Sequence, residues 1–418
     1  MTSITTLDAL ETRAPAERER DLLARLPALI ARAQQAPGWA RILDGVDPAS
    51  ITSRAALAAL PLTRKSDLKT LQDAAPPFGG LAATPTRELA HVFMSPGPIF
   101  DPEGRAQDWW RFARPMFAAG VRAGGLLQNC FSYHFTPAAF MVESGAARIG
   151  CGVIPAGTGQ TEMQVQAMAA LRPSTYVGTP SFLRIIIEKA QESGADISSV
   201  QQALVGAEAL PESLRSWFRA HGVPHVFQTY ASADIGSIAY ETATDGVLDA
   251  GMVIDEEVLL EIVRPGSGEP VAPGDIGEVV VTLFNDDYPL IRFATGDLSA
   301  LLLDGAPNLR TNARIRGWLG RADQTTKVRA MFVHASQVQN IARRHPEVLK
   351  ARLVVSGRMA NDNMTLRCEV AGTPDPALEA AIAASIREVT KLRADVAFVA
   401  PGTLPDDGKA IEDARDYR

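Results

Sequence analysis

The sequence predicts an α/β protein in which a large N-terminal domain is followed by a small C-terminal α+β domain. Short apolar segments alternate with helical patterns between about residues 89 and 300, which is typical of mostly parallel sheets covered by helices. After about residue 250 the segments become richer in β-branched residues, which indicates a small β-barrel-like subdomain. The chain has 418 residues, more than one simple core accommodates, so we expect domains at 1–322 and 323–418.

The first part of the N-terminal domain, residues 7–75, is predicted to consist of helices and turns, because its apolar residues recur at helical spacing. Beyond it, apolar runs predict buried strands at Leu126–Cys130 and Thr175–Val177. Helices are expected at Glu162–Leu171, Ser181–Glu192 and Glu212–His221. Strands that alternate with helices in this way favour a parallel sheet.

The barrel-like subdomain is predicted from two β-rich segments, Val258–Val263 and Glu278–Leu283, which flank turn-forming Pro-Gly pairs. The C-terminal domain is predicted to form a small open α/β sandwich. Its strands are expected at Lys327–Val333, Ala351–Val355, Thr365–Val370 and Val396–Val399, and its helices at Ser336–Arg344 and Pro376–Leu392.

The composition excludes several classes of protein. A formal net charge of −7 argues against a general nucleic-acid binder, which carries a basic face. Cys130, Cys151 and Cys368 form no close pair, so the spacing fits neither a disulfide framework nor a zinc knuckle. The N-terminal segment lacks an apolar signal core, and no run approaches the roughly 18 apolar residues of a membrane span. We therefore expect a cytoplasmic protein that binds neither membranes nor nucleic acids.

Three short segments at the ends of expected strands offer groups for chemistry. Asp297, in Thr295-Gly296-Asp297, could accept both hydroxyls of a ribose, although a β-turn that uses Asp explains the same letters. Glu208, after Gly206-Ala207, stands where open α/β sheets bind ligands, or is a solvated loop carboxylate. Tyr230 and Asp234 offer an aromatic face for a base and an oxygen ligand for Mg²⁺, or a packed tyrosine and a helix cap.

Two further segments lie near and beyond the expected domain boundary. Gly320-Arg321-Ala322-Asp323 stands between the domains, where a linker belongs. Lys409 lies on a Pro/Asp/Gly-rich loop near the C-terminus, and an ammonium on such a loop suits a phosphate that is met transiently. A lysine that serves only solubility is the alternative.

The order and spacing of these segments resemble the motif series of adenylate-forming enzymes, and most closely the phenylacetate–CoA ligase family. Leu60–Leu68 is similar to the family's early "LPFTTKxDL" segment, and the resemblance extends over roughly residues 55–409. It implies an enzyme that activates a carboxylic acid with ATP and Mg²⁺ to acyl-AMP and then transfers the acyl group to CoA. An aromatic acid is expected, and a homodimer agrees with the resemblance.

The resemblance also implies a role for each matching residue. Tyr230 would stack on adenine, with Glu208 beside the base and Asp297 on the ribose. Asp234, where the family has Glu, would face Mg²⁺ or the phosphates, and Lys409 would neutralise charge during adenylation. Further nucleotide contacts are expected at Ser95, Gly97, Gly206, Ala207, Ala231 and Arg321, the substrate pocket at Tyr133, His134, Phe135 and Thr179, and the domain hinge at Asp323.

The sequence departs from the family pattern in three places. Where the family has a phosphate loop of the type "SSGTTGKP", Met94–Gly104 contains three prolines, which remove N–H donors, and no lysine. Ser95 and Gly97 are the best matches that remain. Ala330 replaces a glycine where the CoA arm is expected to pass. Asn129–Phe135 replaces a Gly/Tyr-alternating run, so His134 is either a substrate contact or a structural histidine.

These departures keep two alternatives open. The acceptor of the acyl group could be an amine or a carrier-protein thiol, which Ala330 suggests. The chain could also be a nucleotide- or acyl-binding protein with little catalysis, which the altered phosphate loop suggests. Retention of Lys409, Asp297 and Asp323 favours an enzyme.

Overall fold

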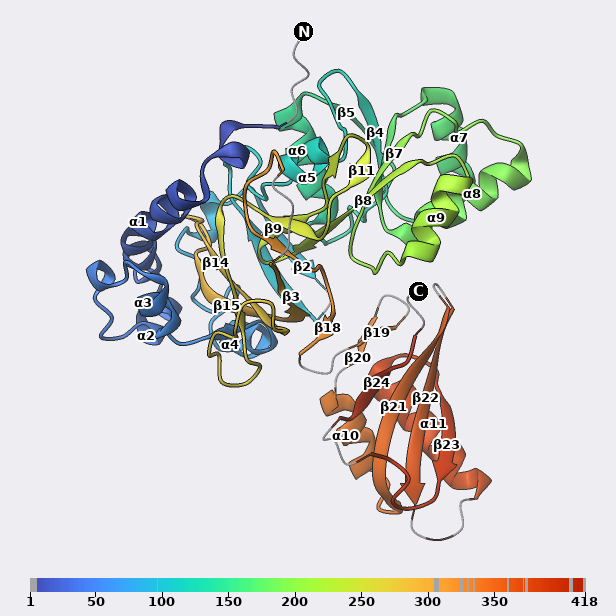
Figure 1. Cartoon of the computed structure of the whole chain (residues 1–418). Coiled ribbons are helices and arrows are strands. Elements are labelled where there is room, and N and C mark those ends of the chain that lie inside the picture. Colours follow the sequence, from blue (N-terminus) through green and yellow to red (C-terminus); the bar gives the residue numbers. More distant parts are fainter. Residues whose placement is uncertain are drawn as a thin grey trace. The chain divides into compact units, whose positions relative to one another are not determined.

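The computed structural model describes residues 6–95, 97–303, 308–322, 326–328, 331–333, 335–358, 361–370, 372, 375–405 and 409–415. The chain divides into two compact units, Met1–Gly320 and Arg321–Arg418, and each is described by itself (Figure 1). The α/β fold class expected from the sequence is confirmed. Among the described residues, no helix is long and apolar enough to cross a membrane.

The first unit begins with short helices, as the apolar spacing predicts. Helix α1 starts at a proline in its first turn, a position where the missing N–H costs nothing, and it buries one apolar stripe, Leu22, Leu26, Leu29 and Ile30. The early helices are α1 (Pro15–Ala33), α2 (Pro37–Ile42), α3 (Arg54–Ala58), α4 (Leu68–Ala74) and α5 (Ala113–Ala118).

A nine-stranded sheet forms the centre of the first unit, in the order β16-β17-β12-β9-β8-β7-β6-β4-β5. Its parallel strands are β4 (Leu126–Asn129), β5 (Gly152–Pro155), β6 (Thr175–Gly178), β7 (Gln202–Val205) and β8 (His225–Ser232). Antiparallel strands continue it with β9 (Gly236–Tyr240), β12 (Met252–Ile254), β17 (Arg314–Ile315) and β16 (Leu301–Leu302).

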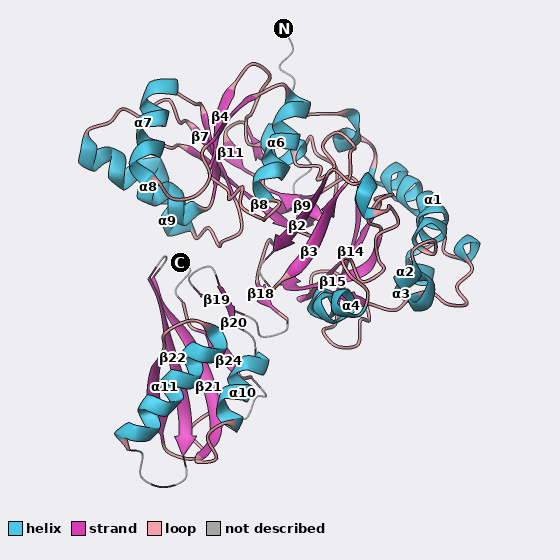
Figure 2. Cartoon of the chain, turned by 180° about the vertical axis from the view of Figure 1, so that it is seen from behind, coloured by secondary structure: helices cyan, strands magenta, loops and turns pink. Residues whose placement is uncertain are grey.

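Helices alternate with the parallel strands and cover them. They are α6 (Ala138–Ile149), α7 (Thr161–Leu171), α8 (Pro180–Ser193) and α9 (Glu212–Ala220), and both ribbon views place α7, α8 and α9 together beside the strands (Figures 1 and 2). All four residues of β6 are buried, as expected for a strand covered on both faces. The sequence placed α7, α8 and α9 within one residue of their observed ends, whereas α6 was not predicted.

A second sheet carries the segments that the sequence assigned to the barrel-like subdomain. Strands β13 (Val258–Val263), β14 (Gly277–Leu283) and β15 (Leu290–Ser299) are antiparallel, and β1 (Thr63–Arg64) adds to β15 in parallel. Since Arg64 lies opposite Ala294, the residues that follow β1 are brought to the level of Thr295–Asp297. Residues that are more than 200 positions apart in sequence thus become neighbours.

Three small elements complete the first unit. Strands β2 (His91–Ser95) and β3 (Ile99–Glu103) form a hairpin, and β10 (Ala243–Thr244) and β11 (Val247–Leu248) form another. Strand β18 (Gly320–Arg321) stands at the boundary between the units.

The second unit has its own core around a four-stranded sheet in the order β23-β22-β21-β24. The sequence expected one strand at 327–333, which is wrong: the segment is a hairpin, because a short apolar run does not distinguish one strand from two arms. The elements are β19 (Thr326–Val328), β20 (Met331–Val333), α10 (Ala335–Arg343), β21 (Val348–Arg358), β22 (Asn361–Val370), α11 (Pro376–Thr390), β23 (Asp395–Val399) and β24 (Ile411–Asp413).

Candidate active site

The turn between β8 and β9 buries the carboxylate of Asp234. Ser232 and Gly236 are paired at the ends of the two strands, so only three residues connect them, and Asp234 is 1% exposed. Gly236 has a φ of +80°, and a Cβ there would lie 2.6 Å from the carbonyl oxygen of Trp110. Local backbone geometry therefore holds Asp234 inward.

Tyr230 and Asp297, which the sequence assigned to one nucleotide site, are in contact although they belong to different sheets. The Tyr230 hydroxyl lies 2.9 Å from Oδ2 of Asp297 and 3.3 Å from Oγ1 of Thr295. The other carboxylate oxygen of Asp297 accepts a hydrogen bond of 3.0 Å from Nε1 of Trp318. Gly296 is fixed in turn, since its N–H donates to Oε1 of Glu278 at 3.2 Å. The aspartate thus has a defined orientation at the junction of the two sheets.

Lys65, just after β1, forms an ion pair with Oδ2 of Asp234. Its side chain is 29% exposed, whereas that of Asp234 is 1% exposed. Burial alone lowers the pKa of Lys65, but the carboxylates of Asp234, Asp101 and Asp297 outweigh it, and the net pKa is raised. Lys65 is therefore a charged ammonium among three carboxylates.

Asp101, on β3, lies beside the same pair. Burial, followed by the neighbouring negative charge of Asp234, raises the pKa of Asp101 well above its usual range, while Lys65 and Ser95 act in the opposite direction. Asp101 Oδ2 and Asp234 Oδ1 are buried and find no hydrogen-bond partner among the described residues. Two carboxylates thus share one lysine and leave an oxygen atom each unsatisfied.

The segment expected at the position of the phosphate loop is the β2–β3 hairpin. Ser95 ends β2 and is paired with Ile99, the first residue of β3, so three residues connect the strands. The Ser95 hydroxyl donates to the carbonyl oxygen of Ile99 at 3.3 Å, and Gly97 has a φ of +141°. Residues 99–103 form a strand, so within Met94–Gly104 only the turn between Ser95 and Ile99 is left as a connection.

The ends of β6 and β7 bring together two more of the expected site residues. Thr179 follows β6 and caps α8, its Oγ1 accepting from the N–H of Phe182 at 3.3 Å. Glu208 follows β7, and its Oε2 accepts from the N–H of Ser181 at 3.2 Å. Gly206 packs against Thr229 of β8, and Ala207 has a φ of +64°. Both segments stand at the carboxyl ends of parallel strands.

The residues expected to line the substrate pocket differ in burial. The Tyr133 hydroxyl lies 2.5 Å from Oε1 of Glu143 and 2.9 Å from Nδ2 of Asn129, and burial, with Glu143, raises the pKa of Tyr133 above its usual range. Phe135 is instead 58% exposed, and the ring of His134 lies edge-on to it at a centroid distance of 4.7 Å. Tyr133 is the member of this group with a fixed, half-buried position.

The remaining expected residues belong to the second unit. Arg321 is half-buried in β18, and Lys409 is exposed next to β24, where its carbonyl oxygen accepts from Nε of Arg352 at 3.2 Å. Asp323 and Ala330 lie outside the described residues. The structure therefore brings together Tyr230, Asp234 and Asp297 within the first unit.

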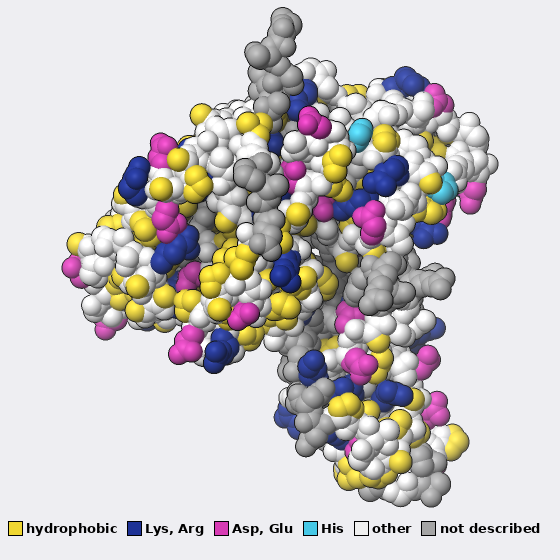
Figure 3. Space-filling model, in the orientation of Figure 1, with side chains coloured by type: hydrophobic (Ala, Val, Ile, Leu, Met, Phe, Trp, Pro, Cys, Tyr) yellow, Lys and Arg dark blue, Asp and Glu magenta, His cyan; other side chains and the backbone are white. Residues whose placement is uncertain are grey.

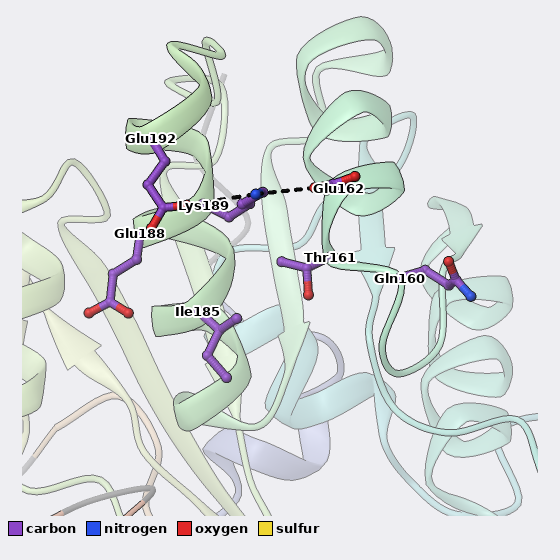
Figure 4. Close-up of a pocket in the computed structure, with 7 residues that line it drawn as sticks. All are labelled: Gln160, Thr161, Glu162, Ile185, Glu188, Lys189 and Glu192. Carbon is purple, nitrogen blue, oxygen red and sulfur yellow. Dashed lines mark ion pairs between the residues drawn. The ribbon is translucent and has the colours of Figure 1, made fainter.

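Two hollows lie away from these residues. One of about 490 Å³ lies between α7 and α8 (Figure 4), where Lys189 pairs with Glu162 at 3.2 Å. None of the expected site residues lines it. The other, of about 250 Å³, lies between α3, the β13 strand and residues 270–275, and it also contains none of them. On the face shown in Figure 3, acidic and basic side chains are interspersed over the first unit.

Sequence reasoning missed three residues of the site: Lys65, Asp101 and Trp318. Lys65 belongs to the segment Leu60–Leu68 that carried the family resemblance, so a signal was present. Asp101 belongs to Met94–Gly104, the segment compared with the phosphate loop, but no motif marks it as a neighbour of Asp234. Trp318 stands in no motif, and only its contact with Asp297 reveals it.

Comparisons with known proteins identify the fold and the family of the chain. The family model of AMP-binding enzymes matches residues 126–282, the segment that carries β4 to β14. A crystal structure of 2-hydroxyisobutyryl-CoA ligase with 2-HIB-AMP and CoA superposes with a TM-score of 0.80 at 24% identity, over 98% of this chain and 92% of that one. The fold is therefore that of an AMP-binding, adenylate-forming enzyme.

The sequence relatives define the family further. A phenylacetate–coenzyme A ligase of Thermus thermophilus is 31% identical over 372 residues, which cover 85% of this chain and 82% of the relative. A phenylacetate–coenzyme A ligase of Aromatoleum evansii is 27% identical over 81% of this chain and 78% of its own length. The chain belongs to the phenylacetate–CoA ligase family. The family expected from the sequence is thus confirmed.

Proposed function

We propose that the chain is an AMP-forming acid–thiol ligase. In the first step, the carboxylate of the acid attacks the α-phosphate of ATP and pyrophosphate leaves. In the second, the CoA thiolate attacks the acyl carbon and AMP leaves. The observation that carries this proposal is the 31% identity to a phenylacetate–coenzyme A ligase over 85% of the chain.

The first unit supplies the nucleotide site in this proposal. Asp297 accepts hydrogen bonds from the ribose hydroxyls, since its carboxylate is held between Tyr230 and Trp318. Tyr230 and the Gly206–Glu208 segment line the base. These groups position and orient the nucleotide. Neither step requires a nucleophilic side chain. Catalysis then depends on holding the reacting atoms close together and on offsetting the phosphate charge.

Mg²⁺ is the metal that this chemistry implies, and the residues fit it. Within the described ranges, no group of three or more His, Cys, Asp or Glu side chains could hold a metal by itself. Mg²⁺ does not need such a cage, because it binds through one or two carboxylates, waters and substrate phosphates. Asp234 would hold it through Oδ1, the oxygen left without a partner. When bound, the metal neutralises charge on the phosphates.

The second unit supplies the groups that change between the two steps. We assign to Lys409 the neutralisation of charge in the adenylation step, to Arg321 a contact to the nucleotide, and to Asp323 the hinge. Ala330 stands on the expected CoA path. If its methyl group obstructs that path, Ala330→Gly raises the CoA-dependent rate and leaves pyrophosphate release unchanged.

The acid is proposed to be aromatic, and Tyr133 is proposed to line its pocket. The test is a pyrophosphate-release screen over aryl and fatty acids, with and without CoA. An aryl acid that releases pyrophosphate and yields a thioester supports the proposal. If product forms only when an amine or a carrier-protein thiol is present, that group and not CoA is the acceptor of the acyl group.

The three-residue turn of the β2–β3 hairpin favours a second candidate, a nucleotide- or acyl-binding protein with little catalysis. Such a protein binds AMP or acyl-AMP and forms no pyrophosphate with any acid. Titration of ATP with Mg²⁺ separates the candidates: affinity in the millimolar range or tighter supports the ligase, and binding of AMP alone supports the second candidate. A homodimer and a cytoplasmic location remain predictions, and light scattering of the purified chain tests the dimer.

A further inference from the structure

The pair formed by Asp101 and Asp234 is an arrangement that burial alone makes unfavourable. Each residue is 1% exposed, and each keeps one carboxylate oxygen without a hydrogen-bond partner among the described residues. A buried polar atom that makes no hydrogen bond costs about 1–3 kcal/mol, and more when it is charged. A proton shared between the two carboxyl groups, or a further positive group, offsets that cost.

Lys65 supplies only part of that positive charge. Its ammonium pairs with Oδ2 of Asp234, on the other side of the carboxylate from the unsatisfied Oδ1. One divalent cation beside Asp101 Oδ2 and Asp234 Oδ1 would satisfy both oxygens.

The hairpin that carries Asp101 is the one that stands in place of a phosphate loop. A phosphate loop works through several converging N–H groups. In the turn between Ser95 and Ile99, two of the three residues are prolines, so Gly97 alone has an N–H to offer. This turn therefore offers a triphosphate a single backbone donor.

We propose that Asp101 is a second carboxylate ligand of the nucleotide's Mg²⁺, and that this metal takes over the holding of phosphates from the missing loop. The inference rests on the proposed function, because it concerns the same nucleotide site. Asp101 and Asp234 bind one ion through their unpartnered oxygens, and the phosphates complete its shell. Lys65 keeps Asp234 oriented and offsets the negative charge on its other oxygen, Oδ2.

This arrangement predicts an unusual dependence on metal. A nucleotide held mainly by backbone N–H groups keeps part of its affinity when Mg²⁺ is removed. Here the β- and γ-phosphates depend on the ion, whereas the ribose and base contacts of AMP do not involve it. Mg²⁺ therefore strengthens binding of a triphosphate strongly and binding of AMP hardly at all.

The test is calorimetric titration of the full chain with α,β-methylene-ATP and, separately, with AMP, each with and without Mg²⁺. Wild-type protein is expected to gain at least about tenfold in affinity for the triphosphate analogue with Mg²⁺, the scale of losses seen around bound metals. Asp101→Asn removes most of that gain and leaves AMP binding unchanged. In metal-free buffer its melting temperature equals or exceeds that of wild type, because the amide N–H can donate a hydrogen bond to Asp234 and carries no charge.

Glu103→Gln is the matched control. Glu103 lies on the same strand, two residues on, but its carboxylate is already paired with Nδ1 of His91 at 2.7 Å. The Glu103→Gln protein should retain the full gain in affinity for the triphosphate analogue with Mg²⁺. If Asp101→Asn fails to bind AMP, Asp101→Ser repeats the comparison with a smaller side chain that also lacks the charge.

The outcomes separate the two proposals. An Asp101→Asn protein that binds AMP and keeps the full Mg²⁺ effect overturns the second ligand, while the ligase proposal stands. Wild-type protein that binds AMP but not the analogue, with or without Mg²⁺, contradicts both. An electron paramagnetic resonance titration with Mn²⁺ and the analogue gives a second readout, in which Asp101→Asn weakens the bound Mn²⁺ signal and Glu103→Gln does not.

Discussion

At the scale of single residues, the site is defined by hydrogen bonds that join distant parts of the chain. Asp297 has a hydrogen-bond donor on each carboxylate oxygen, Tyr230 on one and Trp318 on the other. A carboxylate that is held in this way has a fixed orientation. That is the preorganisation a ribose contact requires.

Lys409 provides the most direct residue-scale prediction. If its ammonium meets the α-phosphate region in the first step, Lys409→Ala slows acyl-AMP formation by about 10²- to 10³-fold, the scale for losing one preorganised charge-stabilising donor. Rapid-quench measurement of acyl-AMP tests this. Thioester formation from supplied acyl-AMP serves as the control and should change far less. Equal losses in both steps would mean that Lys409 has a structural role.

The sequence predicted some residues of the site better than others, for physical reasons. Tyr230 and Asp297 belong to one motif series, so the sequence assigned both to one nucleotide site, but it did not predict the hydrogen bond between them. Lys65 and Asp101 are not predictable as partners of Asp234, because their contacts depend on the pairing of β1 with β15 and on the hairpin register. Sequence spacing does not encode such long-range contacts directly.

At the scale of elements, the β8–β9 turn holds the buried Asp234 in place. Gly236→Ala should lower the free energy of unfolding of the first unit by more than about 1 kcal/mol, because it adds a Cβ 2.6 Å from the Trp110 carbonyl to a residue with positive φ. Urea unfolding followed by tryptophan fluorescence measures it, since all five tryptophans lie in this unit.

A second glycine gives the matched control for that experiment. Gly222 also has a positive φ, +91°, but no atom lies within 4 Å of a Cβ built on it. Gly222→Ala therefore carries only the backbone cost of about 1–2 kcal/mol. The additional loss in Gly236→Ala measures the close approach to Trp110. No additional loss would show that the turn adapts without displacing Asp234.

The N-terminus of α8 offers another element-scale test. Thr179→Ala removes the acceptor for the Phe182 N–H and should lower the stability of the first unit by about 1 kcal/mol. Thr179→Ser keeps the cap and should restore most of the stability in the same urea experiment. A change in KM for the acid that persists in Thr179→Ser would instead indicate contact of the threonine methyl with substrate.

Elements were predictable wherever one strong pattern determined them. Helices α7, α8 and α9 were found from their apolar spacing, and β13 has the predicted ends, Val258–Val263. The β2–β3 hairpin was not found, because prolines in a segment argue against a strand and Pro102 stands within β3. Strand β24 was also not predicted, since its three residues are too few for a periodic pattern.

At the scale of the whole molecule, two units with separate cores suit a reaction in two steps. If the second unit turns about Asp323, Asp323→Pro should fix φ there and slow one half-reaction more than the other. Single-turnover formation of acyl-AMP and conversion of supplied acyl-AMP to thioester measure the two steps. Asp323→Ala, which leaves the backbone free, is the control. Equal slowing of both steps by the proline would contradict a hinge at this position.

The closed end of the β2–β3 hairpin also bears on how such a chain diverges from its relatives. A connection between two paired strands can be lengthened at a small entropic cost, about 0.6 kcal/mol for each doubling of its length. Ser95 and Ile99 form the last pair beneath it, and four further pairs, from Met94 with Phe100 to His91 with Glu103, hold the register of the two strands. A lineage can therefore exchange this turn without repacking the interior. Substitution of this turn, in evolution or by grafting a glycine-rich loop, can therefore change nucleotide binding while the rest of the fold stays unchanged.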